Sequence, residues 1–371
     1  MPVKNNIIVF RCDASVKMGV GHVMRCLTLA EQLSTEGCLV HFICRQHEGH
    51  LIELIERKGF SVFRLDTTQY QSGTSDLLSN SQAQPLFHAD WLGASQEQDA
   101  AQCQPILEGI NPDWLVVDHY ALDYRWQSPL KKHCHKLMVI DDLADRKHEC
   151  DLLLDQTSGR KSETYQNLVP EKCKLLLGAQ YAMLRSEFTQ WRSFSLKRRT
   201  ESATLNKILI TMGGIDQDNI TGKVLSALEN CIVKEKALDV IVVMGSRAPQ
   251  LKKIKEQIEG SSLNITLHVD AVNMAELMAS ADLAIGAAGT TTWERCCLGL
   301  PSLMLVLAKN QECIADNVVN AGGALNLDVR LDYDVVCKQV EYAANNLLEM
   351  SRKSSLIVDG NGVSRVAESL L

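Results

Sequence analysis

Short apolar runs alternate along most of the chain with segments whose apolar residues recur at helical spacing. The apolar run 7–10 is followed by apolar residues that share one helical face, namely Val23, Cys26, Leu27, Ala30 and Leu33. Further strands are expected in the first half at 39–44, 61–65, 114–117, 136–140 and 152–154. Strands that alternate with helices in this way are typical of parallel sheets covered by helices.

The same alternation starts again in the second half of the chain. Strands are expected to begin at Lys207, Val240, Ile265, Ala284 and Ser302. Residues 196–206 contain the charged run Lys197-Arg198-Arg199 and show no apolar periodicity, which favours a linker. We therefore predict an α/β protein with two Rossmann-like domains, 1–195 and 207–371, facing each other across a cleft. A last helix near 362–371 could pack on either half.

Composition narrows the class of protein. The 371 residues are 46% hydrophobic and 22% charged, which is typical of a globular chain. The net charge of −7, with no long basic stripe, argues against nucleic-acid binding. No apolar run approaches the roughly 20 residues that a membrane helix needs. The first residues lead directly into the first strand, so no signal peptide is expected.

The thirteen cysteines are scattered, and none has CxxC spacing. Several occupy apolar positions, such as Cys26, Cys44 and Cys337, where a reduced cysteine acts as a small hydrophobe. This pattern predicts a reducing, cytoplasmic location and no metal site.

The segment Gly19-Val20-Gly21-His22 joins the first strand to the first helix. Glycines let the backbone approach a ligand closely. A helix N-terminus disfavours imidazolium, so His22 is expected to stay neutral near pH 7, as a general base requires. A helix cap is the alternative, and from this segment alone the two interpretations have equal weight.

Polar residues cluster where apolar strands of the first half end. Asp118-His119-Tyr120 follows one strand, and Asp141-Asp142 follows the next. Ligands of open parallel sheets bind at the carboxyl ends of the strands. Aspartates also cap helices, and for Asp141 and Asp142 this alternative has about half the weight.

Loops in the second half have the character of a nucleotide diphosphate site. Gly213-Gly214 lies between a strand and a helix, and so does the segment 286–292, which adds hydroxyl groups. Glu294 could either favour the helix dipole or accept hydrogen bonds from ribose hydroxyls, and the context favours ribose. Asn310-Gln311 follows the next strand. A dinucleotide fingerprint is not matched, because the third glycine is missing and Arg45 replaces the expected acidic residue.

Several segments together resemble the nucleotide-sugar hydrolases of the pseudaminic acid pathway, which remove UDP from UDP-2,4-diacetamido-2,4,6-trideoxy-β-L-altropyranose. The segments are 11–13, 19–22, 141–146, 212–216, 286–302 and 308–311. Ala179 and Ser186 replace expected prolines, and Thr157 replaces a commoner asparagine. The long segment 67–104 resembles the form of these enzymes that has an enlarged first domain. The role of residues 67–84 stays open.

The resemblance implies a GT-B type fold, UDP held by the second domain, and metal-independent hydrolysis in which His22 activates water. An in-line attack by that water is expected to invert the anomeric configuration. No cofactor is expected. Combined with the loops described above, it predicts sugar contacts from Asp13, Gly21, Asp118, His119, Tyr120, Asp142 and Tyr181. It predicts UDP contacts from Gly213, Gly214, Ala288, Gly289, Thr290, Glu294, Asn310 and Gln311.

Other functions share this architecture. A glycosyltransferase would pass the sugar to an acceptor, a 2-epimerase would return a UDP-sugar, and a non-catalytic sensor would bind the UDP-sugar without consuming it. The expected partners are a small UDP-sugar and water, with no nucleic acid and no membrane, and the chain is expected to be a monomer or weak homo-oligomer.

Overall fold

The structure, a computed structural model, describes residues 6–67, 86–229, 231 and 238–371. Of the segment 67–84, whose role the sequence left open, only Thr67 lies within the described residues. The chain divides into two compact units, and each is described by itself. The first unit comprises Met1–Gln156, Arg160–Met183 and Val363–Leu371, and the second comprises Thr157–Gly159 and Leu184–Gly362.

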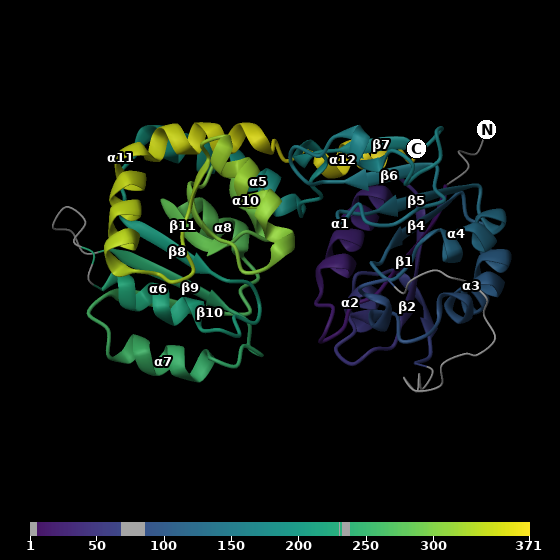
Figure 1. The fold of residues 1–371 in the computed structure, drawn as a ribbon, viewed down its shortest axis with the longest axis horizontal. Helices are drawn as coiled ribbons and strands as arrows, with labels where there is room; N and C mark the ends of the chain where they lie inside the picture. The colour runs from purple at the N-terminus through teal and green to yellow at the C-terminus, as the bar shows by residue number, and fades with distance from the viewer. Residues whose placement is uncertain (1–5, 68–85, 230, 232–237) are drawn as a thin grey trace. The chain divides into compact units, whose positions relative to one another are not determined.

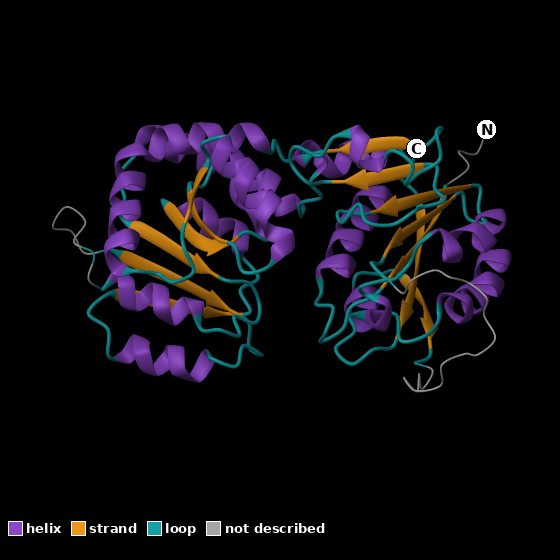
Figure 2. Cartoon of the chain, in the orientation of Figure 1, coloured by secondary structure: helices purple, strands orange, loops and turns teal. Residues whose placement is uncertain are grey.

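The first unit contains a seven-stranded sheet in the order β3-β2-β1-β4-β5-β6-β7, in which all neighbours are parallel (Figure 2). Its strands are β1 (Ile7–Cys12), β2 (Leu39–Arg45), β3 (Ser61–Leu65), β4 (Trp114–Asp118), β5 (Lys136–Ile140), β6 (Leu152–Asp155) and β7 (Lys174–Leu177). Its α-helices are α1 (Gly21–Thr35), α2 (Ile52–Arg57), α3 (Gln96–Ile110), α4 (Tyr124–Leu130) and α12 (Gly362–Glu368).

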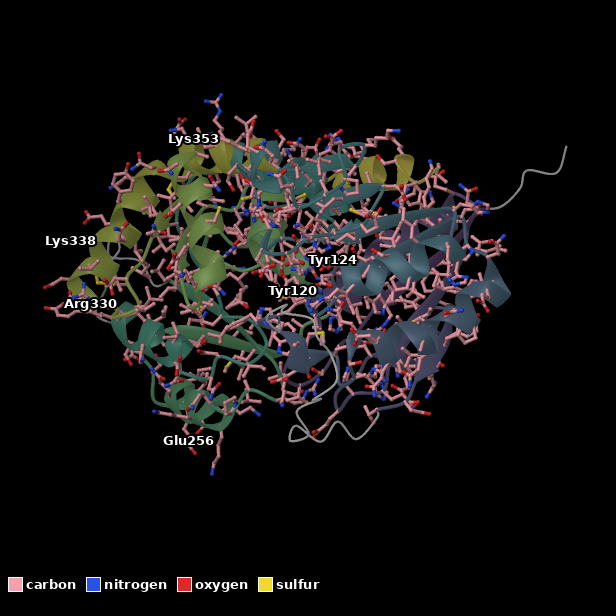
Figure 3. All side chains as sticks on the ribbon, turned by 45° about the vertical axis from the view of Figure 1, so that its right-hand side comes forward. Tyr120, Tyr124, Glu256, Arg330, Lys338 and Lys353 are labelled. Carbon is pink, nitrogen blue, oxygen red and sulfur yellow. A yellow bond between two sulfur atoms is a disulfide. The ribbon has the colours of Figure 1, made fainter. Side chains whose placement is uncertain are left out.

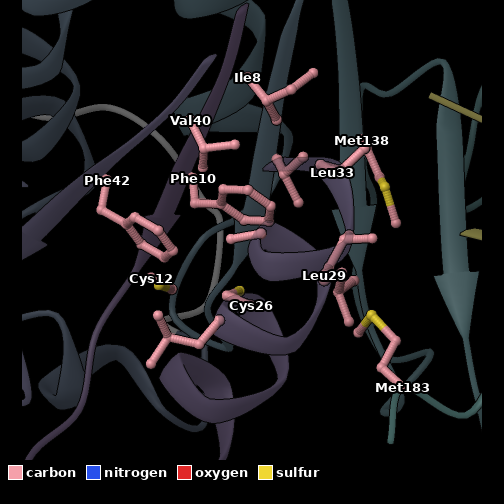
Figure 4. Packing of buried hydrophobic residues seen from close by; sticks show 14 of the residues in the cluster. Ile8, Phe10, Cys12, Cys26, Leu29, Leu33, Val40, Phe42, Met138 and Met183 are labelled. Atoms are coloured by element: carbon pink, nitrogen blue, oxygen red, sulfur yellow. The ribbon is translucent and has the colours of Figure 1, made fainter. Parts of the chain in front are cut away.

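Helices cover both faces of this sheet because its strands are apolar on both sides. Ile8 and Phe10 of β1 pack with α1 and α2, whereas Val9 between them packs with α3 and α4. Figure 4 shows the first face, where Phe10 stacks on Phe42 with ring centroids 5.1 Å apart. The C-terminal helix α12 joins this face through Val363, Val366 and Ala367, and Leu370 after the helix packs there too.

The second unit contains a six-stranded parallel sheet in the order β10-β9-β8-β11-β12-β13. Its strands are β8 (Lys207–Thr211), β9 (Asp239–Met244), β10 (Asn264–Val269), β11 (Leu283–Ala287), β12 (Ser302–Leu305) and β13 (Ala324–Asn326). Its α-helices are α5 (Ser186–Glu201), α6 (Ile220–Leu228), α7 (Leu251–Glu259), α8 (Met274–Ser280), α9 (Thr291–Cys297), α10 (Glu312–Asn320) and α11 (Tyr333–Ile357). The sequence pattern had not indicated β7, β13, α10 or α11.

The segment expected to be a linker, 196–206, is helical over its first part, and the boundary between the units follows Met183. The two arginines of the charged run that suggested a linker donate to carbonyl groups. Arg198 donates to the carbonyl of Ala279, and Arg199 donates to those of Met278 and Ala281. These carbonyls belong to the C-terminal end of α8, where cations and donors are favourable. The basic run therefore fixes α5 to the second unit.

One cysteine differs from its expected state. Cys26 and Cys44 are buried free thiols, as their apolar positions predict. Cys337 instead forms a disulfide with Cys231, which joins α11 to the end of α6. The sequence separation of 106 residues gave no indication of this pairing. Of the helices in the described ranges, none is long and apolar enough to cross a membrane.

Candidate active site

Each sheet has one place where its strand order reverses. In the first sheet β1 lies between β2 and β4, and in the second β8 lies between β9 and β11. At such a place the connections that follow the two neighbouring strands, β1 and β4 or β8 and β11, run to opposite faces of the sheet. This opens a crevice at the carboxyl ends of the two strands. The loops singled out in the sequence follow β1 and β4 in the first unit and β8 and β11 in the second. Topology thus places both groups at positions where ligands bind.

His22 lies in the first turn of α1, beside the end of β4. The register pairs Cys12 of β1 with Asp118 of β4, and this brings the β1–α1 loop to the Asp118 carboxylate. The His22 Nδ1 atom lies 2.6 Å from Asp118 Oδ1, and the His22 side chain is 7% exposed. The α1 N-terminus has no side-chain cap, so His22 does not serve as one. Its ring is held by a carboxylate instead.

Arg25 holds the other side of this carboxylate. Its Nε and Nη2 donate to the two oxygens of Asp118 at 2.5 and 2.6 Å, and its Nη1 donates to Asp142 at 3.0 Å. Burial would raise the pKa of Asp118, but Arg25 and His22 more than offset this and hold the pKa below its ordinary value. Asp118 therefore stays an acceptor. Arg25 was not among the predicted residues, although its spacing from His22 places both on one helix face.

Tyr120 and Asp142 complete the surroundings of His22. The Tyr120 ring lies edge-on to the His22 ring, with centroids 4.5 Å apart and planes at 84°. The Tyr120 hydroxyl donates to Asp142. Burial and the nearby Asp142 raise the pKa of Tyr120, so this hydroxyl keeps its proton. Asp142 thus joins Arg25 to Tyr120, and no helix follows that it could cap.

Asp13 and His119 lie deeper than the sequence suggested. Both side chains are fully buried, and the Asp13 carboxylate lies 2.7 Å from Arg11 Nη1 and 3.4 Å from His119 Nε2. Asp13 also accepts the backbone N–H of Arg45 at 2.6 Å. With no exposed surface, these groups support the loops around the site. Neither side chain is exposed to solvent, so the structure does not show the direct sugar contact expected for them.

The remaining residues predicted for the sugar differ in exposure. Gly21 is exposed, and an added Cβ there would meet no atom within 4 Å, so open space lies beside His22. Tyr181 is half-buried in a short 3-10 helix, Ala179–Tyr181, where it packs against the core that contains α1. Asp141, which was not among the predicted sugar contacts, is buried and accepts the N–H groups of Leu143 and Ala144, so it stabilises a turn.

The glycines of the second unit lie along one sheet edge. Gly213 follows β8 with φ at +89°, and neither it nor Gly214 would meet an atom within 4 Å if a Cβ were added. Gly289, after β11, is equally open. Ala288 is buried and its N–H donates to Leu305, which fixes the β11–α9 loop to the neighbouring strand. Open backbone at these positions can approach a ligand closely.

Arg295 of α9 lies buried behind this loop. Its Nη2 donates to the Ala287 carbonyl at 2.8 Å and to Thr292 Oγ1 at 2.9 Å. A Cβ on Gly286 would lie 2.6 Å from Arg295 Nη1, so only glycine fits there. Burial lowers the pKa of Arg295 to about 10, which still leaves it charged. Among the described residues no carboxylate lies within salt-bridge distance of it. The sequence gave no separate signal for this residue.

Three residues predicted for UDP have different surroundings. The Glu294 side chain is 18% exposed, and its Oε1 lies 3.8 Å from Arg185 Nη2. Thr290 is exposed. The Gln311 side-chain oxygen accepts the N–H of Leu307 at 2.9 Å, which shapes the loop after β12. The side chain of Asn310 is outside the described part of the structure.

Gly245→Ala is expected to displace the Gly213-Gly214 loop. A Cβ at Gly245 would lie 2.3 Å from the Gly214 carbonyl oxygen, a backbone atom that can move away only if the loop shifts. Overpacking of this kind costs about 1–3 kcal/mol of unfolding free energy. Urea unfolding measures this loss. Gly109→Ala, in α3 with no atom within 4 Å of its Cβ, is the matched control and should not be destabilised. Equal stability of both variants would contradict the prediction.

Glu294→Gln is expected to change how stability depends on pH. Burial raises the pKa of Glu294 from its ordinary 4.5 to about 7. Between these values the folded state binds more protons than the unfolded state, so wild-type stability falls as pH rises through this window. The variant lacks this loss, which amounts to at most about 3 kcal/mol.

Urea unfolding at pH 5 and pH 8 tests this dependence. The difference in unfolding free energy, wild type minus Glu294→Gln, should decrease at the higher pH. The exposed Glu256 (Figure 3) supplies the control Glu256→Gln, for which the difference should stay constant. Parallel profiles for wild type and Glu294→Gln would show that this carboxyl titrates normally.

Comparisons with known proteins agree with this architecture. Residues 207–367 match the family model described as the glycosyltransferase family 28 C-terminal domain. The UDP-2,4-diacetamido-2,4,6-trideoxy-beta-L-altropyranose hydrolase of Campylobacter jejuni is 27% identical over 316 residues, covering 85% of this chain and 97% of that protein. The spore coat polysaccharide biosynthesis protein SpsG of Bacillus subtilis is 26% identical over 375 residues, covering 96% of each. The resemblance drawn from the sequence segments is confirmed.

A further relative, an uncharacterized protein of Methanocaldococcus jannaschii, is 27% identical over 309 residues. The match covers 82% of this chain but 56% of that protein, so this chain spans little more than half of it. Among solved structures, MurG of Acinetobacter baumannii has a TM-score of 0.69 at 14% identity, covering 99% of both chains. The UDP-GlcNAc 2-epimerase of Neisseria meningitidis has a TM-score of 0.60 at 14% identity, also covering 99% of both. The predicted fold, two Rossmann-like domains of the GT-B type, is confirmed.

Proposed function

We propose that this chain, a relative of the UDP-2,4-diacetamido-2,4,6-trideoxy-β-L-altropyranose hydrolase, hydrolyses that UDP-sugar to free sugar and UDP in pseudaminic acid biosynthesis. The relative's name and the shared sequence segments support the substrate class. The observation on which the reaction rests is the contact between His22 Nδ1 and Asp118 Oδ1 at 2.6 Å. In this contact the Nδ1 atom is bound to the carboxylate, which leaves Nε2 as the nitrogen that can accept a proton.

Asp118 sets the tautomer of His22. A carboxylate only accepts hydrogen bonds, so the Nδ1 atom that faces it carries the hydrogen. The neutral ring then has its lone pair on Nε2. Arg25 keeps Asp118 ionised and in place through two short hydrogen bonds. This arrangement of orienting carboxylate and imidazole is the one that general-base catalysis needs.

In the proposed step, His22 Nε2 takes a proton from water while the water oxygen forms a bond to the anomeric carbon. The bond from that carbon to the diphosphate oxygen breaks, and UDP leaves with the electron pair. Attack opposite the leaving group inverts the anomeric configuration, as in inverting glycosidases. Open space beside Gly21 leaves room for water and sugar next to the ring.

The second unit is proposed to hold UDP. The loops at Gly213-Gly214 and 288–290 offer backbone N–H groups to the diphosphate, and Glu294 accepts from the ribose hydroxyls. Arg295 supports this placement, because a buried cation without a carboxylate partner is favoured by a nearby anion. Positive charge and N–H groups stabilise the leaving diphosphate, so the proposed reaction requires no metal ion.

A single assay tests this proposal. The purified protein is incubated with the UDP-sugar alone, and free UDP is followed over time in water labelled with heavy oxygen. We expect UDP release, label in the sugar and none in UDP, with turnover unchanged by a metal chelator. Label in UDP would refute attack at carbon, and a lack of UDP release would refute hydrolysis.

A glycosyltransferase is the second candidate, because the match of residues 207–367 is to a glycosyltransferase domain. Such an enzyme would release UDP only after an acceptor is added. A 2-epimerase would convert the UDP-sugar to an isomer without free UDP, and a sensor would leave it unchanged. The assay therefore separates all four functions.

A further inference from the structure

An aromatic cluster borders the His22 site on a segment that the proposed mechanism does not use. Its members are Phe87, His88, Trp91 and Tyr120. The ring centroids lie 4.8 Å apart for Phe87 and His88, and 4.2 Å apart for His88 and Trp91. Tyr120 lies 5.4 Å from His88 and 5.9 Å from Trp91. We call this group the aromatic shelf.

The outer end of the shelf is exposed. Phe87 is 91% exposed, and His88 and Trp91 are half-buried. Moving an aromatic ring from water onto an apolar surface is favourable. Grouped exposed aromatic rings are therefore typical of binding surfaces. A ligand placed on these rings would bury the ring surface that the unit itself leaves exposed.

The inner end of the shelf reaches the candidate base. Tyr120 contacts the His22 ring edge-on at 4.5 Å, while its hydroxyl is held by Asp142. A ligand group on Trp91 or His88 would therefore lie one ring away from His22. The shelf therefore extends outward from the ring of the proposed base.

The segment that presents the shelf is firmly placed. Residues Ala89–Trp91 form a short 3-10 helix, and the next residue, Leu92, is 1% exposed within the core formed with α3 and α4. Gly93 turns the chain with φ at +69°, where an added Cβ would lie 2.8 Å from the His47 ring. A buried anchor and a tight turn thus hold the backbone of the segment that carries Trp91.

The chemistry of the substrate suits such a surface. A 2,4-diacetamido-2,4,6-trideoxy sugar has two acetyl methyl groups and a methyl group at C6, and it lacks the hydroxyls at positions 2, 4 and 6. Methyl groups gain free energy when they move from water onto an apolar surface, whereas hydroxyl groups lose it unless they find hydrogen bonds. A sugar with three methyl groups matches the aromatic shelf better than a fully hydroxylated hexose does.

We propose that Phe87, His88 and Trp91 form a subsite that binds the methyl-bearing substituents of the sugar and selects N-acetylated 6-deoxy UDP-sugars. This inference rests on the proposed function. The three residues are specificity-determining and take no part in proton transfer. UDP lacks the methyl-bearing substituents that this subsite is proposed to bind.

Steady-state kinetics with Trp91→Ala and Phe87→Ala test the subsite. We expect kcat/KM for the diacetamido-trideoxy substrate to fall about 10–50-fold, mainly through KM, as for the loss of apolar contacts in a specificity pocket. Inhibition by UDP should not change. Trp91→Phe should restore most of the loss because it keeps an aromatic face. Unchanged KM in both alanine variants, or an equal weakening of UDP inhibition, would overturn the proposal.

Phe194→Ala is the matched control, because Phe194 is 52% exposed and pairs edge-on with Trp191 on α5 in the second unit. It should leave KM unchanged. Calorimetric binding of the UDP-sugar and of UDP in the His22→Ala background separates the two proposals. If wild type releases no UDP, hydrolysis is refuted, yet a loss of UDP-sugar affinity in Trp91→Ala with UDP affinity kept would still support the subsite. Equal affinities of Trp91→Ala and its parent for the UDP-sugar would refute the subsite.

Discussion

His22→Ala is expected to lower turnover of the UDP-sugar by about 10²–10⁴-fold, the typical worth of a positioned general base. The variant removes the ring whose Nδ1 is held by Asp118 and whose Nε2 would accept the water proton. The proposed UDP contacts belong to the second unit, so UDP affinity should be kept. Free UDP release measures turnover, and calorimetry measures UDP affinity.

The exposed His135 supplies the control for this experiment. His135→Ala removes an imidazole from the same unit and should retain wild-type turnover. If His22→Ala kept near-native turnover while correctly folded, His22 would not be the base. If the variant lost UDP affinity as strongly as turnover, the division of roles between the two units would be wrong.

Asp118→Asn is expected to reduce both turnover and stability. The amide no longer fixes the hydrogen on His22 Nδ1, and this should reduce turnover by about 10²–10⁴-fold, because a wrong tautomer removes the base. The change also leaves Arg25 without its closest carboxylate, which is fully buried. Breaking a buried ion pair costs about 3–5 kcal/mol. Turnover at a temperature where the variant is folded and urea unfolding measure the two effects separately.

Asp123→Ala is the control for the second variant. Asp123 is also buried, but it caps α4 by accepting the N–H of Arg125 at 2.9 Å. Its loss should cost about 1 kcal/mol of stability, as expected for a helix cap, and leave turnover unchanged. Should Asp118→Asn keep full turnover, the carboxylate would be only structural and the tautomer argument would fail.

Much of the fold follows from local patterns. Each run expected to be a strand, from 7–10 to 302–306, became a strand of a parallel sheet. The central strands β1 and β4 are buried on both faces, which is typical of short apolar runs in parallel sheets. Helix α11 was missed although it has 25 residues. Helix α5 was missed because its basic residues resemble a solvated linker. Their carbonyl partners at the end of α8 lie some eighty residues away in the sequence, and no local pattern reports such pairing.

The candidate site shows the same division. The glycine loops and His22 could be found from the sequence because a strand, a flexible loop and a helix start follow one another there. Arg25 and Arg295 were missed, since a charged residue on a helix reads as solvent-exposed until its partners are known. Asp13 and His119 were expected to face the sugar, yet their side chains point into a buried network with Arg11.

By itself, the sequence determined the parallel sheets and the strand-end loops, and it singled out His22 as the candidate base. These depend on residue types and spacings within a short stretch of chain. Only the tertiary structure decided which of these groups meet. The contact of His22 with Asp118 joins residues 96 apart through the pairing of β1 with β4. The arginine positions, the Cys231–Cys337 disulfide and the aromatic shelf likewise depend on long-range packing. Burial and ion pairing are properties of the folded surroundings, and the pattern of one segment does not contain them.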